Sequence, residues 1–158
     1  MKAIGYLLWG IYKLILGCWL EPILNRSFRR AFAEDIRRAM PFLFERYGAK
    51  IIRDPSPESN DPYQDYVTLG ASNLVFKFSK WRDENFAIDV SPTYAPGDSR
   101  KLVDAIRAVN PAEKATGSIS DVSWRPWGKI LEPNFALLQE AFKEDNYAAT
   151  KEKVSQVG

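Results

Sequence analysis

The residues with the most chemical potential are four carboxylates that lie close together in the sequence: Asp54, Glu58, Asp61 and Asp65. Carboxylates grouped in this way can bind a hard cation or act as a general acid and base pair. Their spacing matches no calcium-binding loop, and prolines interrupt the segment DPSPESNDP over residues 54–62. Acidic and small residues mixed with prolines are typical of solvated loops. We therefore predict a loop here, with no metal site and no catalytic residue.

The composition removes most other routes to catalysis. The 158 residues include no histidine and one cysteine, Cys18, so no Ser-His or Cys-His pair and no multi-cysteine zinc site can form within the chain. The sequence has no Gly-x-Ser-x-Gly motif and no phosphate-binding Gly-Lys-Ser/Thr loop. Ser118, Ser120 and Ser123 have no base of the usual kind nearby. We predict a protein that is not an enzyme and needs no cofactor.

An aromatic cluster is the best candidate for binding another protein. Residues 110–129 show no hydrophobic period, which predicts a long loop, and Trp124, Arg125 and Trp127 lie within it. Tryptophan and arginine are the residue types most enriched at interface hot spots, so we predict that these three contact a partner protein. The alternative is that both indoles fold back as a lid on the core.

The charge balance does not favour nucleic acid. Lys and Arg number 22 against 20 Asp and Glu, for a net charge of +2. A nucleic-acid-binding domain of this size usually carries a strongly basic patch. Nucleic acid is therefore not an expected partner.

Residues 2–20, KAIGYLLWGIYKLILGCWL, are the most apolar segment. Three alternatives stay open for it: a transmembrane helix, a lipoprotein signal ending at Cys18, or an amphipathic helix packed on its own domain or on a partner. Its apolar residues follow helical spacing. They are Ile4, Leu7, Leu8, Ile11, Leu14, Ile15 and Cys18. Lys13 interrupts the run, so a lone membrane span would be marginal.

Positive charge follows this segment. Arg26, Arg29 and Arg30, together with Lys13, are the residues predicted to lie near a membrane if one is bound. Arginines in that position hold the rest of the chain in the cytoplasm. We predict a cytoplasmic protein, at the inner face of the membrane in the anchored alternative, with residues 1–22 as an N-terminal helix and 23–158 as one domain.

The stretch from Tyr63 to Pro92 predicts three antiparallel strands in a row. Leu74, Phe76 and Phe78 alternate with polar or smaller residues, and Phe86, Ile88 and Val90 do the same. Alternation places each large apolar set on one face of a sheet. Asp89 falls on the other face, where we predict a cross-strand charge pair with Lys77 or a neighbour. Residues 49–54 predict a further short strand.

Helical patterns flank these strands. Phe32, Ile36 and Leu43 keep helical spacing, with Pro41 expected to kink or restart the helix and Gly48 to end it. A short helix is expected from a cap at Asp98 or Ser99 to Asn110, another from Leu131–Asn134 onward, and a weak last one near Tyr147. The predicted fold is α+β: an antiparallel sheet of about four strands with helices packed on one face, plus the apolar N-terminal helix.

Three segments carry a resemblance to known proteins: FLFERYGAKII (42–52), NLVFKFSKWRDENFAIDVSP (73–92) and FKEDNYAATKEKV (142–154). Over roughly residues 35–155 they resemble a diffuse group of small bacterial α+β proteins of unassigned role, some of them thought to be immunity-type proteins that neutralise a toxin. The resemblance implies a non-enzymatic, protein-binding immunity or defence factor. The alternative is a domain held at the cytoplasmic face of the membrane by residues 2–20 and the arginine cluster.

Overall fold

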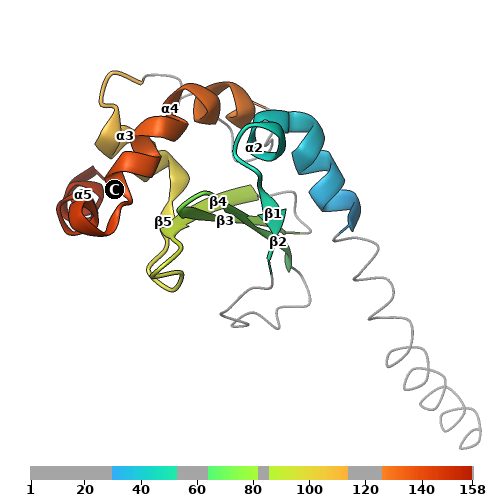
Figure 1. The fold of residues 1–158 in the computed structure, drawn as a ribbon, viewed down its shortest axis with the longest axis horizontal. Helices are drawn as coiled ribbons and strands as arrows, with labels where there is room; N and C mark the ends of the chain where they lie inside the picture. The colour runs from blue at the N-terminus through green and yellow to red at the C-terminus, as the bar shows by residue number, and fades with distance from the viewer. Residues whose placement is uncertain (1–29, 53–63, 82–85, 114–125, 158) are drawn as a thin grey trace, which may run out of the picture.

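The computed structural model describes residues 30–52, 64–81, 86–113 and 126–157. Residues 30–39 are helical. The labelled elements follow in the order α2 (Pro41–Glu45), β1 (Lys50–Ile51), β2 (Gln64–Ala71), β3 (Leu74–Trp81), β4 (Phe86–Pro92), β5 (Arg100–Lys101), α3 (Leu102–Val109), α4 (Trp127–Ala141) and α5 (Glu144–Val157). Figure 1 shows the helices on one side of the sheet. The predicted α+β fold, with an antiparallel sheet and helices on one face, is confirmed; the apolar segment 2–20 lies outside the described residues.

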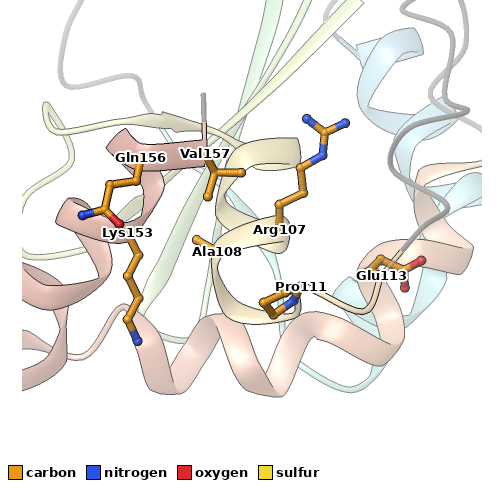
Figure 2. Close-up of a pocket in the computed structure, with 7 residues that line it drawn as sticks. All are labelled: Arg107, Ala108, Pro111, Glu113, Lys153, Gln156 and Val157. Atoms are coloured by element: carbon orange, nitrogen blue, oxygen red, sulfur yellow. The ribbon is translucent and has the colours of Figure 1, made fainter.

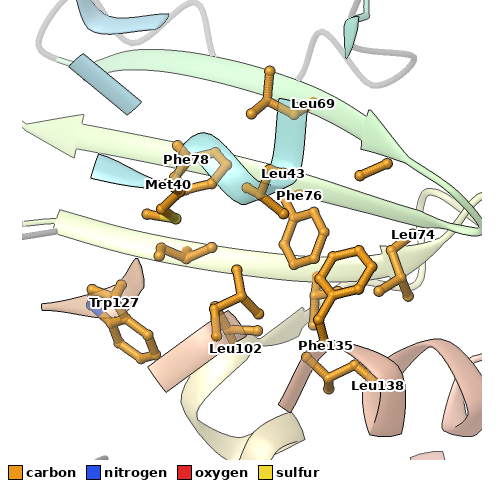
Figure 3. Close-up of a cluster of buried hydrophobic side chains, with 14 of the residues drawn as sticks. Met40, Leu43, Leu69, Leu74, Phe76, Phe78, Leu102, Trp127, Phe135 and Leu138 are labelled. Atoms are coloured by element: carbon orange, nitrogen blue, oxygen red, sulfur yellow. The ribbon is translucent and has the colours of Figure 1, made fainter. Parts of the chain in front are cut away.

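The sheet is a five-stranded antiparallel meander in the order β1-β2-β3-β4-β5. Residues Leu69, Phe76 and Val90 are aligned across β2, β3 and β4. Aligned residues in neighbouring strands share a face, so the alternation seen in the sequence becomes one continuous apolar surface. The helices pack on this surface, and Figure 3 shows side chains of both layers meeting between them. The three strands predicted within residues 63–92 are confirmed.

The other face of the sheet carries a row of polar residues. Thr68, Lys77, Asp89 and Lys101 are aligned across β2, β3, β4 and β5. Burial raises the pKa of the Asp89 carboxyl above its usual range, and the ammonium groups of Lys77 and Lys101 offset part of that shift. The predicted position of Asp89 opposite Lys77 in the neighbouring strand is confirmed by the register.

The two-residue strand β5 adds to the strands expected from the sequence and corrects the predicted start of the following helix. Arg100 and Lys101 pair with Val90 and Asp89 as β5, where the sequence suggested a helix already begun after a cap at Asp98 or Ser99. The helix starts at Leu102, and its N-cap residue Lys101 makes no side-chain cap bond. The pairing with β4 holds the backbone extended at the position where local capping preference favoured a helix.

The break before α2 follows the sequence closely. Pro41 is the first residue of α2, where its missing N–H costs no helical hydrogen bond. Gly48 then adopts φ +60°, and the Ala49 N–H donates to the Leu43 carbonyl at 2.9 Å to close the turn. The predicted restart at Pro41 and the left-handed conformation of Gly48 are confirmed, although α2 itself ends at Glu45, with Arg46 as its C-cap residue.

The start of α4 differs from the prediction. The helix begins at Trp127 and continues through Pro133, where the sequence indicated a helix opening at residues 131–134. Pro133 removes one backbone N–H from the helix interior. Beside it, the buried Asn134 side chain donates from Nδ2 to the Ile130 carbonyl at 2.8 Å and accepts at Oδ1 from Asn110 Nδ2 at 2.8 Å. These bonds tie the proline-containing turn of α4 to the end of α3.

Asp98 fastens α5 to the loop that precedes β5. Its carboxylate contacts Arg100 Nη2 at 2.8 Å and Lys151 Nζ at 2.7 Å, and its carbonyl accepts from the Tyr147 hydroxyl at 2.7 Å. Burial, with the Asp98 charge as a smaller cause, raises the pKa of Tyr147 to about 12. The phenol therefore keeps its proton in the folded chain at pH values where it ionises in the unfolded chain.

This raised pKa predicts a loss of stability at alkaline pH. Between the ordinary pKa of 10.0 and about 12, the unfolded state releases a proton that the folded state retains, so the free energy of unfolding falls as pH rises through this window. The Tyr147→Phe variant should lack this part of the pH dependence, although it also loses the hydrogen bond to Asp98. Urea denaturation of the wild type and of Tyr147→Phe at pH 8, 10 and 11 gives the free energy of unfolding at each pH. If this free energy falls by the same amount with rising pH in the two proteins, the prediction is wrong.

Candidate functional site: a groove between three helices

Trp127 does not lie on the surface. Its side chain is only 8% exposed, and Figure 3 shows the indole among the core side chains at the start of α4. A buried indole cannot contact a partner in this conformation, so the prediction of Trp127 as a contact residue is corrected. For Trp127, the structure agrees with the alternative prediction, in which the indole folds back onto the core. Trp124 and Arg125 lie outside the described residues.

Of the residues predicted to lie near a membrane, the structure describes Arg30 alone. It is exposed at the start of helix 30–39, whereas Lys13, Arg26 and Arg29 lie outside the described residues. Further along the same helix, Glu34 lies between Arg37 and Arg38, at 3.8 and 3.7 Å from their guanidinium nitrogens. The exposed surface of helix 30–39 therefore carries charge of both signs.

Two absences concern the described part of the chain only. Within it, no group of three or more Asp, Glu, Cys or His side chains is placed to hold a metal ion. None of the helices it contains is both long and apolar enough to cross a membrane. The side chains of Asp54, Glu58, Asp61 and Asp65 all lie outside the described residues.

A hollow of about 560 Å³ lies where the end of α3 meets the end of α5. In Figure 2, Ala108 of α3 and Pro111 of the following turn lie between Lys153 of α5 and Glu113. Val157, at the end of α5, closes the hollow and is 42% exposed. The lining combines apolar side chains with three charged ones, Arg107, Glu113 and Lys153.

A second hollow of about 310 Å³ lies beside the first, between α3, α4 and the first half of α5. Ala108 and Lys153 line both hollows, so the two form one depression, which we call the helical groove. Leu137 of α4 lines the second hollow and is 45% exposed. Its floor is built mainly from small side chains, among them Ala141 and Ala149.

The helical groove runs along one face of α5. The lining residues of α5 are Asn146, Ala149, Thr150, Lys153, Gln156 and Val157, which follow helical spacing. At about 1.5 Å per residue, the distance from the first to the last is about 16 Å, or three helical turns. The groove is therefore long enough for a short helix or several residues of an extended chain.

The carboxylates of the groove are already engaged. Glu140 contacts Lys143 Nζ at 2.5 Å and accepts from Asn146 Nδ2 at 3.1 Å, and these contacts, led by the hydrogen bond from Lys143, lower its pKa. Glu113 accepts from Asn134 Nδ2 at 3.2 Å. Lys153, at the centre, is exposed and forms no ion pair with any described residue. Lys153 is therefore an exposed cation that both hollows share, in a lining that also carries Arg107, Glu113 and Glu140.

This arrangement suits binding. The described lining offers no histidine or cysteine and no convergent carboxylate pair. It offers exposed apolar carbon, which gains free energy when covered, and a cation that can pair with an acidic group. Four large hydrophobic side chains of the described residues are exposed, and two of them, Leu137 and Val157, line this groove.

Sequence reasoning missed the groove because three helices from separate segments build it. One signal was present in α4. Phe135, Leu138 and Phe142 form the apolar face that packs on the core, and all three are fully buried. Leu137 does not belong to that face, so a large apolar residue was left at a position expected to be exposed.

Comparison with known proteins adds no relative: no protein-family model matches the sequence, no curated protein is significantly similar to it, and no solved structure significantly resembles it.

Proposed function

We propose that this chain is a non-enzymatic protein-binding domain, and that the helical groove receives an acidic, partly apolar segment of its partner. The observation that carries the proposal is that exposed Leu137 and Val157 line two adjoining hollows, which share Lys153, a cation that forms no ion pair with any described residue. A monomeric surface rarely keeps large apolar side chains together unless something covers them. Covering Leu137 and Val157 supplies affinity, and Lys153 attracts an acidic group on the partner.

An immunity or defence-associated role fits this mode of action. A protein of that type works by occupying a surface of its target, which requires a binding face and no catalytic group. The proposed compartment is the cytoplasm, because Arg26, Arg29 and Arg30 follow the apolar segment 2–20 and positive charge is retained on that side.

The test introduces a charge into the groove. Leu137→Glu places a carboxylate on apolar surface that the partner must desolvate, so binding of the purified partner should weaken at least tenfold, about 1.4 kcal/mol. Ala136→Glu is the matched control, because Ala136 is exposed on α4 and does not line the groove. Partners are identified by co-purification of the full chain from its native cells, and each affinity is then measured by isothermal titration calorimetry.

The comparison among the three proteins decides the result. Binding that is lost with Leu137→Glu and kept with Ala136→Glu supports the groove. Equal affinity for wild type and both variants would show that the partner binds elsewhere. Circular dichroism of both variants checks that they fold, which their exposed positions favour.

A further inference from the structure

We infer that the segment bound in the helical groove is a short amphipathic helix with a carboxylate between two apolar side chains. This inference rests on the proposed function and specifies the partner's chemistry. It follows from the backbone that surrounds the groove, from the order of the lining side chains, and from their charge.

The backbone of the groove favours a helix over an extended strand. An extended peptide binds most readily where a sheet edge offers unpaired N–H and C=O groups to its own backbone. Here α3, α4 and α5 form the walls, and away from the helix ends the backbone groups of a helix are hydrogen-bonded within it. A helical ligand satisfies its own backbone groups and needs none from the walls.

Small side chains let such a helix approach closely. Ala108, Ala141 and Ala149 come from three different helices, and all three line the second hollow. Helices pack at about 8–10 Å between axes, and the shorter distances need small residues at the contact. The groove's length of about 16 Å along α5 matches a ligand of about three turns, or roughly 11 residues.

Three exposed side chains of the groove follow the order apolar, positive, apolar. Leu137 lines the second hollow, Val157 lines the first, and Lys153 lies where the two join. Lys153 and Val157 are four residues apart, so about one helical turn separates the central charge from one apolar end. A complementary helix therefore carries an Asp or Glu between two apolar residues, about one turn from the one that contacts Val157.

Two other occupants of the groove have the wrong charge. The apolar segment 2–20 of this chain contains Lys2 and Lys13 and no acidic residue, so it would bring positive charge to Lys153. A second copy docked groove to groove would bring one Lys153 close to the other. Both arrangements place like charges together, which disfavours them.

The test selects peptides on the full chain. A displayed library of 12-residue helical peptides, with the central positions randomised, is enriched on wild-type protein, on Leu137→Glu and on Lys153→Glu. We expect wild type to enrich Asp or Glu between two apolar residues, and Lys153→Glu to enrich Lys or Arg at the same position. Lys129→Glu is the charge-matched control, since Lys129 is exposed on α4 and does not line the groove.

Individual peptides then give the size of the effect. Changing the selected acid to Lys should weaken binding to wild type about fivefold, as expected for an exposed ion pair, and the loss should shrink at high salt. Lys153→Glu should restore the binding of the peptide that carries Lys. Lys129→Glu should leave the affinities for the acidic peptide and for its Lys variant unchanged.

The outcomes separate this inference from the proposed function. Peptides that need Leu137 but show no acidic preference and no response to Lys153→Glu would overturn the acidic helix alone. Tighter binding of a synthetic peptide of residues 2–20, or self-association that Leu137→Glu abolishes, would identify a different occupant and also overturn it. If no enriched peptide depends on Leu137, the proposed function itself fails.

Discussion

Replacing Phe135 by alanine should lower the free energy of unfolding by about 3–5 kcal/mol, because Phe135 joins the helical layer to the sheet. Its ring lies 3.8 Å from that of Tyr47 and 5.9 Å from that of Phe76, both stacked, and meets Phe42 edge-on at 6.1 Å between ring centroids. The side chain is fully buried, so truncation leaves a cavity bordered by three elements that cannot all close on it.

Leu137→Ala is the natural comparison, two residues further along α4. Leu137 is 45% exposed, so its loss should change stability by no more than about 0.5–1 kcal/mol. Urea denaturation of both variants, followed by circular dichroism and by tryptophan fluorescence, measures the difference. Similar midpoints for the two variants would mean that Phe135 is not the centre of the interlayer contact.

Gly128→Ala should destabilise the protein by about 2 kcal/mol although alanine is the better helix former. A Cβ atom on Gly128 would lie 2.4 Å from the carbonyl oxygen of Ala39, far inside van der Waals contact. The obstacle is backbone, so it can yield only if helix 30–39 and α4 move apart. The helix-propensity gain of about 1 kcal/mol is smaller than the cost of that movement.

Gly97→Ala serves as the control for this substitution. Gly97 is exposed, and a Cβ there would meet no heavy atom within 4 Å. Its melting temperature should match that of the wild type within experimental error. If Gly128→Ala melts at the same temperature as Gly97→Ala, the two helices do not approach as closely as the structure shows.

The sheet was predictable because its signal is local and regular. Leu74, Phe76 and Phe78 alternate with smaller or polar residues in β3, and β4 repeats the pattern, so one period gives both the strand and its buried face. The same alternation placed Asp89 beside Lys77 on the other face. The roles of Pro41 at the start of α2 and of Gly48 in the turn after it were also predictable, since each depends on the backbone preference of the residue itself.

The errors occurred where distant contacts override local preference. Arg100 and Lys101 form a strand because β4 lies beside them, and nothing in their own sequence demands it. The start of α4 was misplaced because Pro133 commonly opens a helix. Here Asn110 and Asn134 support the turn in which it lies, and the Trp127 side chain is buried in the core one and a half turns earlier.

The candidate site was the least predictable part. Leu137 could be recognised as an apolar residue off the buried face of its helix, but Ala108, Lys153 and Val157 are unremarkable in sequence. These residues come together in one site only when α3, α4 and α5 pack and leave two adjoining hollows between them. A groove formed by three segments has no periodicity of its own to read.

The sequential order of the strands also bears on how the chain emerges from the ribosome. Each strand pairs with the next one made, so the sheet can assemble in the order in which it is synthesised. The helix α4, which covers the apolar face of the sheet, is synthesised later, because Phe135 follows Val90 by roughly 45 residues. At about 5–20 residues per second, this separation corresponds to about 2–9 s of translation. During that interval only helix 30–39 and α2 can cover the apolar face, and the part that α4 later covers is accessible to chaperones and to neighbouring nascent chains.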